Sequence, residues 1–65
     1  MIKVTRLDGL EYYLNPHQIE SIEVTPDTTL VMLSGKRLIV REEVDTILEM
    51  IETYRRRISP FMSEE

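Results

Sequence analysis

The chain has 65 residues, of which 42% are hydrophobic and 31% charged, with a formal net charge of −4 and no cysteine. This length allows one domain with a small core, and the missing cysteine excludes disulfides and thiol catalysis. A single histidine argues against a metal site built from protein ligands alone. Domains of this size commonly rely on a disulfide, a metal or a partner subunit, so we expect support from a second copy of the chain or from another protein.

The apolar and charged residues also indicate where the protein acts. The longest apolar run, Leu30–Leu33, is far shorter than the roughly 20 residues that a membrane span needs. The first residues lack the apolar block and the cleavage site of a signal peptide. We therefore expect a cytoplasmic protein without membrane insertion. The net charge of −4 argues against general nucleic-acid binding, which depends on neutralising phosphates.

The first forty residues predict five short strands. Asp8-Gly9 is a signal for a two-residue hairpin turn, and Ser34-Gly35 turns the chain again. Asn15-Pro16 and Pro26-Asp27 interrupt the strands between these turns. The expected strands cover residues 2–7, 11–14, 21–25, 28–33 and 37–40, and the fourth is apolar on both faces, as in a central strand. We predict a small five-stranded antiparallel sheet, strongly twisted, or a partial barrel.

After Glu42 the apolar side chains recur at helical spacing, and a helix is predicted over residues 43–57. Its apolar stripe consists of Val44, Ile47, Leu48, Ile51, Tyr54 and Ile58. Acidic residues in the first turn and Arg55–Arg57 in the last complement the helix dipole. Ser59-Pro60 predicts the end of the helix, so residues 59–65 are expected to form a short mobile tail. The predicted fold is α+β, mainly β, with one domain over residues 1–58.

The sequence offers few groups for catalysis. His17 lies beside a turn proline, and an exposed loop histidine is the simplest interpretation. The two glycines are accounted for by hairpin turns, so no phosphate-binding loop is indicated. We therefore predict a non-enzymatic protein with no cofactor, no metal and no small-molecule substrate.

Several residues are candidates for contact with a partner protein. Lys36 and Arg37 lie on a hairpin, and only the fold decides whether they converge with Arg6 and other strand cations. Tyr13 faces away from Tyr12 and Leu14 on its strand, so it is expected at the surface. The apolar residues beyond the predicted helix either fold back on the core or dock on another chain. The candidate partner-binding residues are Arg6, Tyr13, Lys36, Arg37, Phe61 and Met62.

Four segments in this order resemble a known family. They are Val4-Thr5-Arg6-Leu7, Tyr13-Leu14-Asn15-Pro16, Thr25-Pro26-Asp27-Thr28 and Leu33-Ser34-Gly35-Lys36. The chain is similar, over about residues 1–58, to the flagellar protein FlbD family, also called the swarming motility protein SwrD family.

The resemblance implies a small cytoplasmic protein that supports flagellar motor power, acting with or on the stator proteins MotA and MotB. It implies no catalytic residues. The first hypothesis is therefore a protein-binding accessory factor, with a sheet edge, the exposed tyrosine and Arg6 as its recognition surface. The alternative is a small RNA-binding regulator of flagellar genes, because the order of strands and helix is similar to that of the carbon storage regulator family. The net charge does not favour this alternative.

Overall fold

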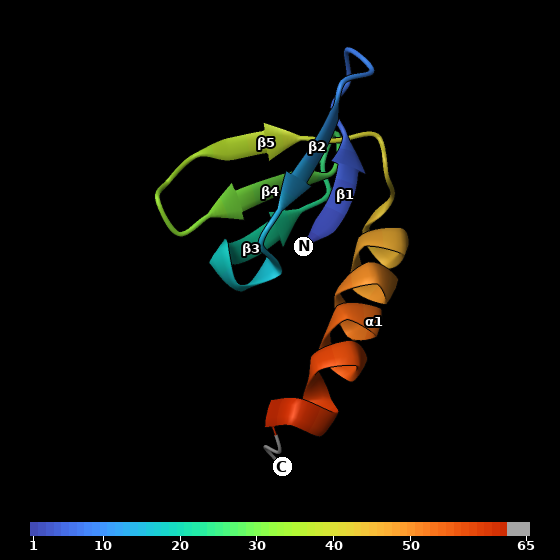
Figure 1. Cartoon of the computed structure of the whole chain (residues 1–65). Coiled ribbons are helices and arrows are strands. Elements are labelled where there is room, and N and C mark those ends of the chain that lie inside the picture. The colour runs from blue at the N-terminus through green and yellow to red at the C-terminus, as the bar shows by residue number, and fades with distance from the viewer. Residues whose placement is uncertain (63–65) are drawn as a thin grey trace.

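The structure, a computed structural model, describes residues 1–62, with side chains described up to residue 58. It contains β1 (Ile2–Thr5), β2 (Glu11–Leu14), β3 (Ile19–Glu23), β4 (Thr29–Met32), β5 (Arg37–Ile39) and α1 (Val44–Met62), with a 3-10 turn at Pro16–Gln18 (Figure 1). All strand pairs are antiparallel. The predicted fold class, mainly β with one C-terminal helix, is confirmed.

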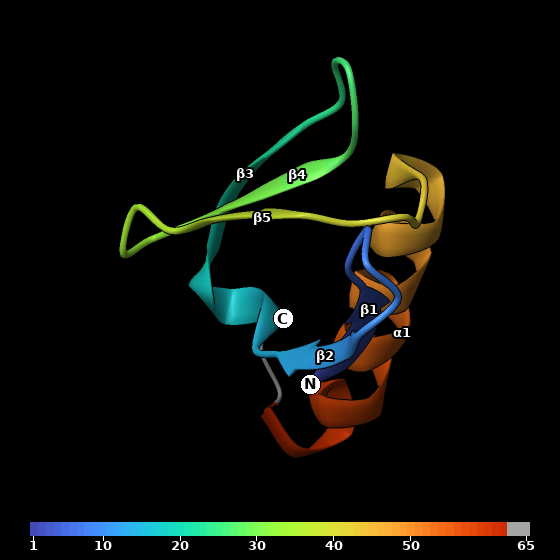
Figure 2. The same ribbon diagram turned by 90° about the horizontal axis from the view of Figure 1, so that it is seen from above.

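The strands form two sheets instead of the single sheet predicted from the sequence. β1 pairs with β2, while β3, β4 and β5 form a three-stranded sheet with β4 at its centre. A single bridge between Arg6 and Val40 joins the two sheets. Figure 2 shows the sheets on opposite sides of the core, meeting near the start of α1. The sheets divide because β1 enters its hairpin turn directly after Arg6, so its pairing with β5 stops at the bridge.

The first hairpin, between β1 and β2, closes through a three-residue loop. The Gly9 N–H donates to the Arg6 carbonyl at 2.9 Å, and the Arg6 N–H donates to the Leu10 carbonyl at 2.8 Å. Gly9 has φ +93°, a backbone conformation that residues with a β-carbon rarely adopt. These features define a type I turn followed by a bulge glycine. The two-residue turn predicted at Asp8-Gly9 is therefore wrong by one residue.

The β4–β5 hairpin repeats the same loop. The Gly35 N–H donates to the Met32 carbonyl, and the Met32 N–H donates to the Lys36 carbonyl, both at 2.8 Å. Gly35 also has φ +93°. In each loop the residue before the glycine, Asp8 or Ser34, accepts a bond from the backbone N–H two residues further on. The two hairpins are thus built by the same local chemistry.

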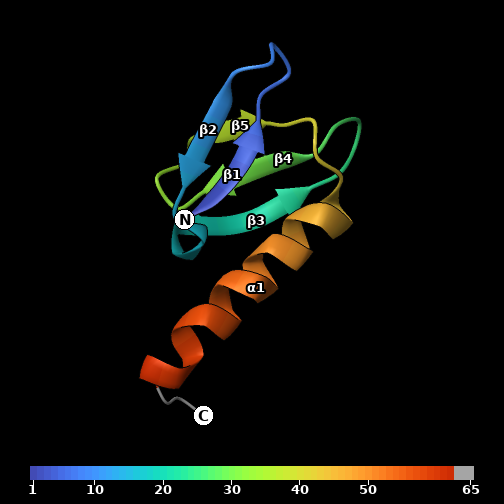
Figure 3. The ribbon, with the colours of Figure 1, turned by 45° about the vertical axis from the view of Figure 1, so that its right-hand side comes forward.

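The core lies between the sheets and the first turns of α1. Its buried apolar residues are Ile2, Val4, Leu14, Leu30, Leu38, Val40 and Ile47. Among the side chains of α1 that the structure describes, Ile47 is the only member of this cluster, and further along the helix Met50, Ile51 and Tyr54 are partly buried against it. Leu48, which the helical pattern placed in the apolar stripe, is 51% exposed. Figure 3 shows that the later turns of α1 extend past the strands.

The apolar sequence of β4 suggests a strand covered on both faces, but the outer face of β4 has no second layer of the described chain over it. Val31 and Thr29 face outward. Instead Arg37 on β5 forms an ion pair with Glu23 on β3, reaching across β4. Thr29, which is buried, lies between Glu23 of β3 and Ile39 of β5 in the register of the sheet.

The helix ends later than predicted. α1 continues through Ser59-Pro60 to Met62, so the expected stop at that dipeptide is wrong. Proline removes one backbone hydrogen bond and tends to bend a helix, but it does not have to terminate it. The side chains of Phe61 and Met62, and all of residues 63–65 of the predicted tail, lie outside the described residues.

Candidate partner-binding site

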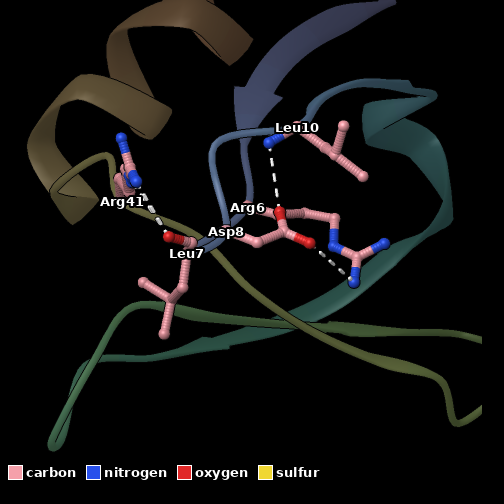
Figure 4. A network of polar contacts seen from close by, with 5 residues as sticks. All are labelled: Arg6, Leu7, Asp8, Leu10 and Arg41. Atoms are coloured by element: carbon pink, nitrogen blue, oxygen red, sulfur yellow. Dashed lines mark hydrogen bonds and ion pairs between the residues drawn. The ribbon is translucent and has the colours of Figure 1, made fainter.

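The β1–β2 hairpin is fixed in place by Arg41, which follows the last strand. The Arg41 guanidinium donates two hydrogen bonds to the Leu7 carbonyl, from Nη2 at 2.9 Å and from Nε at 3.2 Å. Figure 4 shows Arg41 and Arg6 approaching the turn from different sides. Arg6 lies 3.5 Å from the Asp8 carboxylate, which also accepts a bond from the Leu10 N–H. The turn is therefore stabilised by contacts within the loop, from Arg6 and Asp8, and by a contact from outside it, from Arg41.

A second attachment joins β1 to the connection between β5 and α1. The Arg41 N–H donates to the Thr5 carbonyl at 2.8 Å, and the Thr5 N–H donates to the Glu42 carboxylate at 2.9 Å. Partial burial is the largest single effect and raises the pKa of the Glu42 carboxyl, but the hydrogen bonds from Thr5 and the Glu42 backbone and the Arg41 charge together outweigh it. The net result is a pKa below the ordinary value, so Glu42 is ionised at neutral pH.

Beyond these attachments, the hairpin and β5 diverge and enclose a hollow of about 420 Å³, which we call the basic groove. Its lining combines three cations, one carboxylate and several apolar side chains. The residues are Arg6, Leu7, Asp8 and Tyr12 from the first hairpin, and Lys36, Arg37, Leu38 and Ile39 from β5 and the residue before it. The basic groove thus brings together Arg6, Lys36 and Arg37, three of the six predicted partner-binding residues.

The cations of the basic groove are not held in strong internal pairs. Lys36 Nζ donates to the Tyr12 hydroxyl at 3.1 Å and lies 5.3 Å from the centre of that ring. Within the described residues Lys36 forms no ion pair. The side chains of the Arg6–Asp8 and Arg37–Glu23 pairs are about half exposed, and such surface pairs contribute little to stability. The three cations can therefore reorganise toward an incoming anion at small cost.

Tyr13 lies outside the basic groove. Its side chain is 65% exposed on β2, as its alternation with Tyr12 predicted. It borders a neighbouring cavity of about 310 Å³, whose lining also includes Met1 and Lys36. Phe61 and Met62, the remaining predicted contacts, lie outside the described side chains. The structure thus places Tyr13 near the groove without making it part of the lining.

The sequence prediction missed the apolar part of the lining. Leu7 is 49% exposed at the tip of its hairpin, and Ile39 is 44% exposed on β5. The exposure of Leu7 could have been predicted, because an apolar residue directly before a turn Asp-Gly has little chance of burial. The exposure of Ile39 could not have been predicted, because its neighbours Leu38 and Val40 are equally apolar and both are buried.

His17 contacts the C-terminal helix. Its ring packs edge-on against Tyr54 of α1, with 5.5 Å between ring centres. In the described part of the chain, no group of three or more histidine or carboxylate side chains is arranged to hold a metal ion. Nor does any helix among the described residues combine the length and apolar character needed to cross a bilayer.

Comparison with known proteins gives one family. The family model described as FlbD, flagellar and swarming motility proteins, matches residues 1–59. This match takes in both hairpins and every residue that lines the basic groove. The comparisons with curated proteins and with solved structures gave no match.

Proposed function

Because the chain belongs to the FlbD family of flagellar and swarming motility proteins, we propose that it is a non-enzymatic, cytoplasmic accessory protein that supports flagellar motor power. It acts through contact with another protein at or near the stator. One observation carries this proposal: Arg6, Lys36 and Arg37 converge with exposed Leu7 and Ile39 on a single hollow.

This combination suits protein recognition. Exposed apolar side chains supply the area that is removed from water on binding, and the surrounding cations select an acidic partner and steer its approach. The walls of the groove are fixed before binding by the Arg41 and Glu42 attachments. A preformed site loses less conformational entropy on binding than a flexible one.

Deleting the gene in the source bacterium tests the proposal at the level of the motor. We expect flagella in normal number and a lower torque in single tethered cells. Missing flagella or altered flagellin levels would instead indicate a role in assembly or expression. Normal torque together with normal swarming would overturn the proposal.

The Lys36→Glu variant tests the basic groove in the same cells. Lys36 is exposed and forms no ion pair among the described residues, so the fold should tolerate the change. We expect torque to fall toward that of the deletion strain, because the groove then loses the excess positive charge that attracts an acidic partner. Arg56→Glu is the matched control: it makes the same charge change on the exposed side of α1, where Arg56 meets Glu52. Equal torque in the two variants would remove the groove from the mechanism.

The converging cations also give the RNA-binding alternative a concrete site. RNA affinity that depends on phosphate contacts falls steeply with salt. A gel-shift titration of the purified protein against single-stranded RNA at two salt concentrations therefore separates the hypotheses. We expect no salt-dependent complex.

A further inference from the structure

The outer edge of β5 presents backbone groups that point away from its own sheet. Opposed residues in an antiparallel pair alternate between hydrogen-bonded and non-bonded positions. Met32 donates to the Lys36 carbonyl and Val40 donates to the Thr28 carbonyl, so both of these pairs are bonded. With the observed register, the N–H and C=O groups of Arg37 and Ile39 must point outward, away from β4.

These outward groups face the place that β1 leaves vacant. The Arg41 N–H, on the same edge of β5, donates to the Thr5 carbonyl, and the bridge from Val40 to Arg6 follows. β1 then turns into its hairpin, so the bridge brings Leu7 opposite the Ile39 carbonyl but the pairing does not reach the Ile39 N–H or Arg37. Both of these residues line the basic groove. Within the described residues, no backbone group bonds to the Ile39 N–H or to the outward groups of Arg37.

We propose that the basic groove takes up an extended acidic segment of a partner protein, which adds as an antiparallel strand to the open edge of β5. This inference rests on the proposed function and specifies the chemistry of its partner. The register predicts the order of side chains in that segment. Opposite Ile39 and Leu38 it carries two apolar residues, followed toward its C-terminus by two acidic residues opposite Arg37 and Lys36.

Charge decides between a foreign segment and a second copy of this chain. Edge-to-edge pairing of two copies around a twofold axis would bring the Lys36–Arg37 pair of one β5 toward that of the other. Like charges across paired strands are destabilising, and cations on an edge strand are a common protection against self-association. The same cations attract an acidic strand, which makes this edge selective.

The open edge of β3 does not fit the same partner. Its register shifts between Ile19 and Ser21, and an irregular strand pairs poorly with an incoming one. It also carries Glu20 and Glu23, which repel an acidic segment. Compared with the β3 edge, the β5 edge therefore combines an even register with a complementary charge.

The test is a titration of the isotope-labelled protein with two short synthetic peptides, followed by NMR. One peptide contains Val-Val-Glu-Glu and the other Val-Val-Lys-Lys, each flanked by threonines. Before addition, the Arg37 and Ile39 amides should exchange with solvent faster than the Leu38 amide, which bonds within the sheet. With the acidic peptide, we expect new protection and chemical-shift changes at the Arg37 and Ile39 amides. The lysine peptide should cause neither.

Two pairs of variants separate backbone pairing from charge. Ile39→Pro removes only an outward N–H, which an edge strand tolerates, whereas Ile39→Ala keeps that donor. We expect the proline variant to bind the acidic peptide about tenfold more weakly than the alanine variant does, since it loses one backbone hydrogen bond. Lys36→Glu should remove most of the preference for the acidic peptide, while Arg56→Glu should leave that preference unchanged. Circular dichroism shows whether each variant is folded.

Four results would overturn the inference: equal binding of both peptides, shifts centred on β3 or α1, tighter binding of single-stranded RNA, or a dimer that forms through β5. Absence of any shift at Arg37 and Ile39 up to millimolar acidic peptide would overturn it as well. Its failure is distinct from failure of the proposed function. If the deletion strain loses torque but cells with folded Ile39→Pro keep it, the function stands and the edge-pairing inference falls.

Discussion

At the scale of single residues, Glu42 has the clearest structural role. Its carboxylate accepts the Thr5 N–H at 2.9 Å, on the side of β1 that faces away from β2. Partial burial opposes ionisation, yet the hydrogen bonds from Thr5 and the nearby Arg41 charge hold the pKa of Glu42 below 4.5. A carboxyl group whose pKa is lower in the folded than in the unfolded chain stabilises the fold when it is ionised.

The contribution of Glu42 to stability therefore depends on pH. It is fully present above the unfolded pKa, near 4.5, and is lost as the pH falls through the lower folded pKa. We compare the native chain with Glu42→Gln, which keeps the shape of the side chain but does not titrate. In urea unfolding at neutral pH the native chain should be more stable, and its advantage should disappear on acidification. A difference between the two proteins that does not change with pH would contradict this account.

At the scale of elements, the two hairpin loops depend on their glycines. Gly9 and Gly35 both have φ +93°, a region in which a β-carbon strains the backbone. Space is not the constraint. A β-carbon on Gly35 would meet nothing within 4 Å, and one on Gly9 would meet Arg41 Nη2 at an ordinary 3.7 Å. The preference for glycine at these positions is therefore conformational, and it fixes the bend that opens the basic groove.

Substitution of Gly35 measures this conformational term directly. Gly35→Ala should lower the free energy of unfolding by about 1–2 kcal/mol, the cost of placing a side chain in the left-handed region. Gly35→Asn should cost less, because asparagine adopts that region more readily. Urea denaturation of the two variants gives the comparison. Equal losses would show that the loop does not keep its positive φ in solution.

At the scale of the whole molecule, one helical side chain closes the core. Ile47 is fully buried among residues of both sheets, while Leu48 beside it is 51% exposed. Small domains of this kind have little stability to lose, about 3–5 kcal/mol from a single core. Attachment of α1 through Ile47 is therefore a condition for folding.

Truncation of these two neighbours should have very different effects. Ile47→Ala should cost about 2–5 kcal/mol, enough to unfold much of the population, and Ile47→Val should cost about 0.5–1.5 kcal/mol. Leu48→Ala should change stability by no more than about 0.5 kcal/mol. Thermal unfolding followed by circular dichroism measures all three. Similar melting temperatures for the alanine variants would contradict the observed position of α1.

Local signals explain which features could be predicted from the sequence. The turns at Gly9 and Gly35 and the burial of Ile47 follow from residue chemistry and spacing over a few positions. The division into two sheets could not be predicted, because it depends on where β1 departs from β5, more than thirty residues away in the chain. The same distant contact determines that Arg6 meets Lys36 and Arg37. The end of α1 was missed because a proline lowers helix stability without deciding where the helix stops.

The bonds that secure β1 have a consequence for synthesis on the ribosome. β1 is made first, but its partners on the outer side, at Val40, Arg41 and Glu42, are made only after more than half of the chain. Until they emerge, the nascent chain presents an open strand edge, and the core lacks Ile47. A product that terminates before Glu42 keeps that edge open to other polypeptides. Folding of this domain therefore has to wait until the residues through Ile47 have emerged.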